Sequence, residues 1–166
     1  MTDDLPGETI HASCVLVDEA GVLIRGASGA GKSSLAHMLL VEGSLDGGFA
    51  RLVCDDRVRI ERRAGRLVAR AVAPLSGYLE VRGVGILPVR HEASAVVRLV
   101  VDCLDHRPAR LPDTADQVAV VQGIVLPRVA LRPEAALARI ILWRLRALAD
   151  GAFQDRAFED TVRVPG

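Results

Sequence analysis

A glycine-rich stretch with one lysine and one serine carries the strongest chemical signal in the sequence. Residues 26–33 read Gly-Ala-Ser-Gly-Ala-Gly-Lys-Ser, which fills every fixed position of the phosphate-binding pattern G-x-x-x-x-G-K-[ST]. In this pattern backbone amides surround phosphate oxygens, the lysine reaches the β and γ phosphates, and the hydroxyl ligates Mg²⁺. We call residues 26–33 the glycine-rich loop. The residues expected to bind ATP with Mg²⁺ are Gly26, Ala27, Ser28, Gly29, Ala30, Gly31, Lys32, Ser33 and Ser34.

The segments on either side of the loop have the composition that this motif requires. Residues 12–17 and 21–25 are short apolar runs separated by an acidic, glycine-containing turn, which predicts two strands before the loop. Residues 32–41 have a helix-forming composition, and the glycines among residues 43–48 predict where that helix ends. A phosphate-binding loop is expected between a strand and a helix, so the motif lies in its proper context.

Two adjacent carboxylates form the second chemical signal. Asp55 and Asp56 end a β-prone run that starts near Phe49, in the manner of the acidic strand end that assists Mg²⁺ in nucleotide-binding proteins. Neighbouring residues on a strand face opposite ways, so both can point to one ligand only if the strand ends there. We expect one of them to face the metal or the attacking group and the other to support the loop.

Composition limits the class of protein. Half of the 166 residues are apolar and only 3% are aromatic, which indicates a core of aliphatic side chains and favours an α/β sheet covered by helices. Basic and acidic residues balance at 21 each, which argues against a global attraction to nucleic acid or an anionic membrane. Cys14, Cys54 and Cys103 lack metal-ligand spacing and suit buried free thiols. With no apolar run of membrane-spanning length, we expect a cytoplasmic protein.

The remaining patterns predict one mixed α/β domain. Alternating residues in 58–62 and 66–70 predict a half-exposed hairpin, and residues 95–102, 118–121 and 123–131 are further strand candidates. Residues 133–148 have the periodicity of an amphipathic helix. The predicted fold is a P-loop nucleotide-binding domain over residues 1–166, with a central mixed β-sheet and flanking helices. Residues 1–10 and 155–166 are expected to be loose termini.

Residues 77–86 form one more β-prone segment with charges. Glu80 and Arg82 would share one face of a strand, and Gly83 and Gly85 follow closely. Pattern alone allows two interpretations, an exposed ion pair before a turn or a pair of functional charges.

Taken together, four segments resemble the catalytic domain of the HPr kinase/phosphorylase family. They are His11-Ala12, the glycine-rich loop, residues 55–58 reading Asp-Asp-Arg-Val, and residues 79–86 reading Leu-Glu-Val-Arg-Gly-Val-Gly-Ile, the last being similar to a signature of that family. The similarity runs in order over roughly residues 8–148. The family phosphorylates a serine of HPr, the small phosphocarrier protein of the bacterial sugar phosphotransferase system, and this chain resembles a short form without the usual amino-terminal domain.

The resemblance implies roles for individual residues. It assigns proton transfer to the paired aspartates, with Asp56 as the preferred acceptor and Asp55 as the alternative, and with His11 beside the acceptor. Glu80 is implied as a second oxygen ligand of Mg²⁺ after Ser33, and Arg110 falls where the family keeps a catalytic arginine. The implied partners are HPr as substrate and further copies of the chain in a homohexamer.

One segment departs from the family pattern. Residues 131–136 read Leu-Arg-Pro-Glu-Ala-Ala, which keeps Arg132-Pro133 but lacks the Gly, Arg and Asn associated with the reverse, phosphorylase reaction. The resemblance therefore implies the kinase reaction and leaves the phosphorylase reaction open. Two alternatives stay open from sequence: a regulatory module that binds ATP without transferring phosphate, and a P-loop kinase acting on a small molecule.

Overall fold

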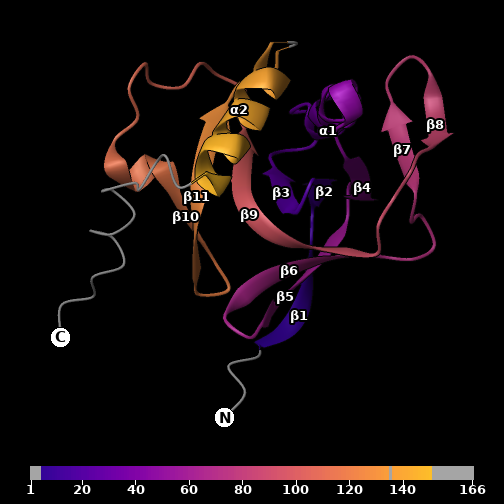
Figure 1. The fold of residues 1–166 in the computed structure, drawn as a ribbon, viewed down its shortest axis with the longest axis horizontal. Coiled ribbons are helices and arrows are strands. Elements are labelled where there is room, and N and C mark those ends of the chain that lie inside the picture. The colour runs from indigo at the N-terminus through magenta and orange to yellow at the C-terminus, as the bar shows by residue number, and fades with distance from the viewer. Residues whose placement is uncertain (1–4, 135, 151–166) are drawn as a thin grey trace.

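The computed structural model describes residues 5–134 and 136–150, and a curled mixed sheet with two helices forms its body (Figure 1). The strands of this sheet are β1 (Leu5–Ile10), β2 (Ala12–Val17), β3 (Ala20–Arg25), β4 (Ala50–Cys54), β5 (Val58–Arg63), β6 (Arg66–Ala71), β9 (Ser94–Cys103), β10 (Val118–Val121) and β11 (Ile124–Leu131). The helices are α1 (Lys32–Gly43) and α2 (Leu137–Ala149), with short 3₁₀ turns at Leu45–Gly47 and Thr114–Gln117. A separate hairpin consists of β7 (Tyr78–Val81) and β8 (Gly85–Pro88).

The order of the strands places the end of β3, where the glycine-rich loop begins, beside the end of β9. The sheet runs β1-β5-β6-β9-β3-β2-β4, with β11 paired to β9 and β10 paired to β11. Two of its pairs are parallel, β3 with β9 and β9 with β11, and the remaining pairs are antiparallel. Arg25 at the end of β3 is therefore level with Asp102 near the end of β9. The predicted α/β fold with a central mixed sheet and flanking helices is confirmed.

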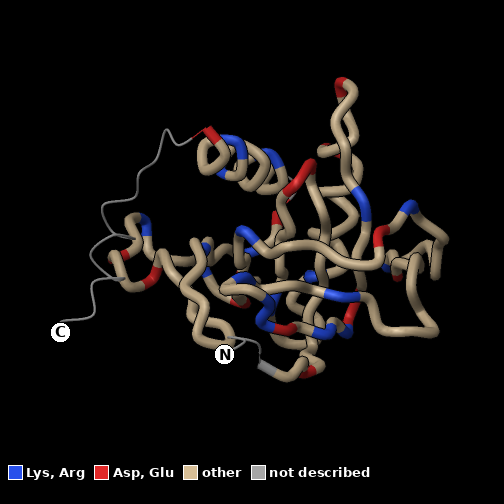
Figure 2. The backbone as a smooth tube through the Cα atoms, turned by 60° about the horizontal axis from the view of Figure 1, so that its bottom comes forward, with Lys and Arg blue, Asp and Glu red and all other residues tan. Residues whose placement is uncertain are grey.

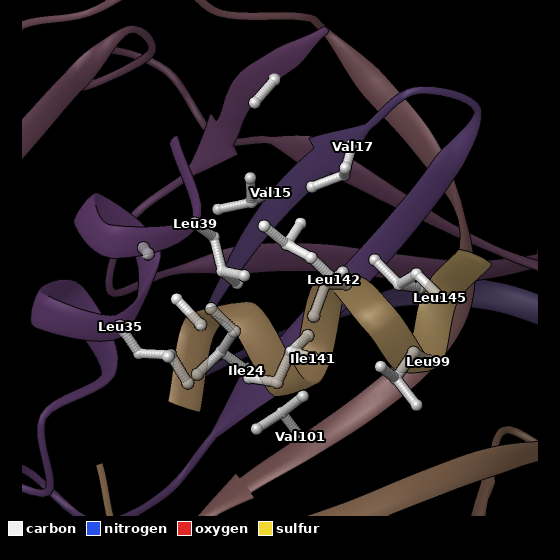
Figure 3. Close-up of a cluster of buried hydrophobic side chains, with 14 of the residues drawn as sticks. Val15, Val17, Ile24, Leu35, Leu39, Leu99, Val101, Ile141, Leu142 and Leu145 are labelled. Atoms are coloured by element: carbon white, nitrogen blue, oxygen red, sulfur yellow. The ribbon is translucent and has the colours of Figure 1, made fainter. Parts of the chain in front are cut away.

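Both helices pack on one face of the sheet (Figures 1 and 3). The buried side of α2 follows a helical spacing, since Ala138, Ile141, Leu142 and Leu145 are buried while Trp143 is exposed. The labelled side chains of Figure 3 meet between the helices and strands β2, β3 and β9: Leu35, Leu39, Ile141, Leu142, Leu145, Val15, Val17, Ile24, Leu99 and Val101. This cluster fixes α1, and with it the end of the glycine-rich loop.

The opposite face of the sheet buries a second cluster because the sheet curls around it. Side chains from β2, β3 and β4 meet others from β5, β6, β9, β10 and β11 there. Members include Leu23, Val53, Ile60 and Leu67, all at most 1% exposed. The central strands are thus covered on both faces, which is why β2 and β3 are almost continuously apolar.

Most elements agree with the sequence predictions. The strands expected over residues 12–17, 21–25, 58–62, 66–70, 95–102, 118–121 and 123–131 are present within one or two residues. Helix α1 begins at the predicted Lys32 and ends two residues later than predicted. Helix α2 starts at Leu137 rather than at Pro133, because β11 continues to Leu131 and the chain must then turn from the sheet edge. The three cysteines are free and buried, as expected.

Two predictions were wrong. Residues 5–10 are not a loose terminus: they form β1, which pairs with β5, and the strand escapes sequence detection because Pro6 and Gly7 interrupt the pattern. Strand β7 ends at Val81, so Arg82 lies in the turn to β8 and does not share a strand face with Glu80. The amide of Val84 donates to the carbonyl of Val81 (3.0 Å) and closes that turn. Residues 155–166 lie outside the described residues.

Charges are mixed along the described chain. Figure 2 shows basic and acidic positions interspersed on strands and loops, in keeping with the formal net charge of zero. In the part of the chain that the structure describes, neither helix has the length and apolar character needed to cross a membrane.

Candidate active site

The glycine-rich loop connects β3 to α1, so the predicted strand-loop-helix arrangement is confirmed. Gly31 caps the helix with a φ of 95°, and a Cβ there would lie 3.2 Å from Pro133. Gly26 has a φ of 153°, and a Cβ there would lie 2.8 Å from the carbonyl oxygen of Cys103. Only glycine suits both conditions at these positions, because an L side chain would be strained and crowded.

The loop leaves donors for an anion at the start of α1. The first helical bond runs from the amide of Leu35 to the carbonyl of Gly31 (2.9 Å). Helix geometry leaves the preceding amides of Lys32, Ser33 and Ser34 without a carbonyl one turn earlier, and the helix dipole adds positive character there. At Gly29 a Cβ would meet nothing within 4 Å, so the loop is open on that side. These features fit a phosphate group.

Lys32 lies at the centre of the site with its ammonium group engaged. Its side chain is 6% exposed, and Nζ lies 3.0 Å from each of three atoms: the carbonyl oxygens of Gly26 and Ala27 and Nε2 of His11. An ammonium group can only donate, so Nε2 of His11 accepts and its ring proton is on Nδ1. No spacing pattern in the sequence predicts this contact between Lys32 and His11.

The other ring nitrogen of His11 faces a carboxylate. Nδ1 of His11 lies 3.1 Å from Oδ1 of Asp56, and both side chains are about half or more exposed, at 47% and 65%. With the proton on Nδ1, the ring donates to the carboxylate. His11 thus connects Lys32 to Asp56, and the structure brings together three residues predicted to be catalytic.

Asp55 belongs to a different set of contacts. Its Oδ1 accepts from the hydroxyl of Ser33 at 2.8 Å and from the hydroxyl of Ser13 at 2.7 Å. Its Oδ2 lies 3.1 Å from the Ser33 hydroxyl and 3.3 Å from the backbone amide of Glu80. The two adjacent aspartates therefore contact different residues, and both reach the site because β4 ends at Cys54.

Oxygen atoms suited to Mg²⁺ meet beside the loop. The Ser33 hydroxyl and the Asp55 carboxylate are in direct contact, and Mg²⁺ prefers such ligands together with phosphate oxygens and water. The residues present therefore fit a nucleotide with its metal ion. The backbone amide of Glu80 donates to the Asp55 carboxylate beside these oxygen atoms. The side chain of Glu80 is exposed, so its role as a metal ligand stays a prediction.

Arg110 and Ser34 stay predictions as well. Arg110 is exposed in the segment between β9 and the Thr114–Gln117 turn, and no hydrogen bond or ion pair joins it to the described loop residues. Ser34 is exposed on the first turn of α1, beside the glycine-rich loop.

Ser13 is a residue that the sequence interpretation missed. It is fully buried in β2, and its hydroxyl also accepts from the backbone amide of Asp56 (3.3 Å). A signal was present, because Ser13 is the one polar residue in an otherwise apolar strand, two positions after His11.

An ion cluster supports the loop from the neighbouring strands. Arg25 donates from Nε and a terminal nitrogen to the two carboxylate oxygens of Asp102 (2.7 and 2.9 Å), and Nε of Arg128 donates to the same carboxylate (2.5 Å). Burial raises the pKa of Asp102, but the hydrogen bonds and charges of the two arginines outweigh burial and hold that pKa below its usual range. The cluster ties β3, β9 and β11 together next to Gly26.

Burial also raises the pKa values of the three cysteine thiols. It raises the pKa of Cys103 to about 11, although the nearby charge of Lys32 works in the opposite direction. Burial raises the pKa of Cys54 to about 12, and the charge of Asp55 adds to that increase. Burial also raises the pKa of Cys14 well above its usual value. These thiols are poor nucleophiles near neutral pH.

Comparison with known proteins gives a consistent set of relatives. A family model described as the HPr Serine kinase C-terminal domain matches residues 5–98. The HPr kinase/phosphorylase of Geobacter sulfurreducens is 30% identical over 150 residues, which is 82% of this chain and 45% of that protein. The HPr kinase/phosphorylase of Clostridium beijerinckii is 42% identical over 90 residues, which is 54% of this chain and 28% of that protein.

A solved structure covers more of the chain. The Hpr(Ser) kinase/phosphatase from Coxiella burnetii is similar with a TM-score of 0.68 and 26% identity, covering 87% of this chain and 99% of that one. The chain spans less than half the length of the curated relatives described above.

Proposed function

The chain belongs to the HPr kinase family, and from this premise we propose that it transfers the γ-phosphoryl group of ATP to a serine hydroxyl of an HPr-type phosphocarrier protein. We further propose that ATP and Mg²⁺ bind at the glycine-rich loop. The observation that carries the proposal is the connected set Lys32–His11–Asp56, in which the lysine of the phosphate-binding motif and an exposed carboxylate contact the same imidazole.

The proposed division of work follows from these contacts. Bound ATP with Mg²⁺ supplies the phosphoryl group and neutralises part of the charge on its oxygens. The loop amides and Lys32 hold the phosphates, and Ser33 with Asp55 holds the metal ion. Asp56 accepts the proton of the attacking serine hydroxyl, whose O–H bond breaks as its oxygen forms the new O–P bond. The bond between the γ phosphorus and the β–γ bridging oxygen of ATP breaks in the same transfer, and ADP leaves. His11 orients the Asp56 carboxylate through its Nδ1 proton.

Two further features of the family resemblance stay proposals. We expect a homohexamer, which light scattering of the purified chain would test. We do not expect the phosphorylase reaction, because residues 131–136 differ from the run associated with it. Release of phosphate or pyrophosphate from phosphorylated HPr on addition of inorganic phosphate would contradict that expectation.

The decisive experiment is transfer of labelled γ phosphate from Mg-ATP to purified HPr of the same organism. Lys32→Ala is the control, because it removes the ammonium group that would bind the phosphates and keeps every backbone amide of the loop. One labelled HPr serine with the wild type and none with the control would support the kinase proposal. Retained transfer in Lys32→Ala would overturn the loop assignment. ATP binding without any labelling would favour the regulatory module, and labelling of a small molecule instead of HPr would favour the small-molecule kinase.

A further inference from the structure

Ser13 has an unusual position for a polar side chain. Its relative exposure is 0%, and its neighbours in β2, Ala12 and Cys14, are equally buried. A buried hydroxyl must be hydrogen-bonded to avoid a large desolvation cost. This hydroxyl makes hydrogen bonds to both members of the aspartate pair: it donates to Oδ1 of Asp55 (2.7 Å) and accepts from the amide of Asp56 (3.3 Å).

The backbone that Ser13 contacts is strained. After β4 ends at Cys54, the amide of Arg57 donates to the carbonyl of Asp55 (2.8 Å), which makes a γ-turn centred on Asp56. Asp56 has a φ of 66°, in the left-handed region, which is strained for a non-glycine residue and persists only where the surrounding structure holds it. The Ser13 hydroxyl accepts the amide hydrogen of this strained residue and is held by β2, which pairs with β3 on one side and with β4 on the other.

This turn lets both carboxylates reach residues of the site, each with its own partner. On a regular strand, Asp55 and Asp56 would face opposite sides of the sheet. In the turn, the carboxylate of Asp55 reaches Ser33 while that of Asp56 reaches His11. One buried hydroxyl contacts the side chain of the first aspartate and the backbone of the second, so it fixes both at once.

We propose that Ser13 is a positioning residue that assigns the two aspartates to separate tasks: it holds the Asp55 carboxylate at the metal-binding hydroxyl of Ser33, and it holds the Asp56 backbone in the turn that directs its carboxylate to His11. The tasks rest on the proposed function, whereas the positioning itself does not. Ser13 touches neither nucleotide nor acceptor in this assignment and acts through the aspartates.

The first test uses the ligand-free protein. We expect Ser13→Ala to increase the hydrogen-exchange rate of the Asp56 amide by at least about tenfold, because the amide loses its acceptor. Ser13→Cys keeps the shape of the side chain with a somewhat larger atom and replaces a strong acceptor with a weak one, so it should show the same change if the alanine variant folds poorly. Ser13→Thr keeps the hydroxyl and should restore slow exchange. Ser94→Ala, a serine replaced in another strand, is the matched control.

The second test measures the metal. We expect the Mg²⁺ concentration that half-saturates binding of a fluorescent ATP analogue to rise about 10- to 100-fold in Ser13→Ala, the range for loss of a group that orients a metal ligand. Turnover should fall while the KM for HPr stays within twofold. Binding and exchange within twofold of wild type in both Ser13→Ala and Ser13→Cys would overturn the proposal. Altered exchange in a protein that never phosphorylates HPr would instead refute the proposed function and leave the positioning role standing.

Discussion

Nζ of Lys32 and Nε2 of His11 lie 3.0 Å apart, although 21 positions separate the two residues in the chain. The same ammonium group donates to the carbonyls of Gly26 and Ala27, so its three hydrogens are used within the protein. A phosphate group that binds in the loop must therefore replace at least one of these partners. Lys32 thus connects residues 26 and 27 of the loop to His11 and would exchange one of these partners for a phosphate oxygen.

This exchange of partners is directly measurable because Lys32 is the only lysine of the chain. Protein labelled with ¹⁵N-lysine should give one side-chain ammonium signal, visible because Lys32 is 6% exposed and hydrogen-bonded. Mg-ATP should shift this signal, since a phosphate replaces a neutral carbonyl or imidazole as acceptor. His11→Gln should shift it in the ligand-free protein. An ammonium signal whose chemical shift does not change at saturating Mg-ATP would contradict phosphate binding by Lys32.

The buried thiols give a prediction about reactivity. With a pKa of about 11, Cys103 is ionised in about one molecule in a thousand at pH 8, and Cys54, with a pKa of about 12, in fewer still. We expect iodoacetamide to modify none of the three cysteines in the native protein at pH 8, and all three in guanidinium chloride, as counted by mass spectrometry. Reactivity should increase with pH, and Cys103 should respond first. Rapid native labelling at pH 8 would contradict this environment.

Much of the fold follows from patterns that the chain carries locally. The strand, loop and helix around residues 20–43 are each specified by adjacent residues, which is why their bounds are close to the predicted ones. Strand β1 was not predictable in this way, because its structure depends on pairing with β5, about fifty positions away. The same limit applies to the start of α2, since the end of β11 depends on pairing with β9.

For the site, the sequence identifies most of the residues but not the contacts between them. The loop, Asp55, Asp56 and His11 were found from motif and resemblance, but their pairing was not. Whether His11 contacts Asp55 or Asp56 depends on a γ-turn at the end of β4. Nothing in the residues around Asp56 predicts its φ of 66° in that turn. Ser13 was missed because a single serine in a strand is ordinary until the side chains opposite it are known.

The ion cluster of Asp102 predicts an acid-dependent loss of stability. Because its pKa is lower in the folded protein than the ordinary value of about 3.9, the charged carboxylate stabilises the fold above that pH, and this contribution is lost as the pH falls through the folded pKa. We expect Asp102→Asn to lower the free energy of unfolding at pH 7 by about 1.5–3 kcal/mol, as for hydrogen bonds to charged groups.

The measurement is urea unfolding of both proteins between pH 7 and pH 2. Other carboxylates also titrate in that range, so the difference between wild type and variant is the quantity of interest. The difference should be constant down to about pH 4 and then shrink. Glu19→Gln, in the exposed turn between β2 and β3, is the control and should follow the wild type. A difference that grows on acidification would show that the cluster does not stabilise the ionised carboxylate.

Asparagine substitutions at the two aspartates should separate chemistry from binding. Asp56 contacts His11 and not Ser33, so Asp56→Asn should reduce phosphoryl transfer by about 10²- to 10⁴-fold, the usual contribution of a general base, while Mg-ATP still binds. Asparagine tolerates a positive φ, so the turn at residue 56 should persist. Asp55→Asn should instead weaken Mg²⁺-dependent binding, because it alters the carboxylate that accepts from the Ser33 hydroxyl.

Single-turnover transfer and equilibrium binding of a fluorescent ATP analogue, each with and without Mg²⁺, distinguish the two variants. Asp18→Asn replaces an exposed aspartate in the β2–β3 turn, also at positive φ (52°), and serves as the matched control with wild-type behaviour expected in both assays. Wild-type transfer by Asp56→Asn would move the proton acceptor to Asp55. If Asp56→Asn loses as much binding as Asp55→Asn, the two carboxylates act together on one ligand. The separate contacts with His11 and Ser33 would then not describe the site with Mg-ATP bound.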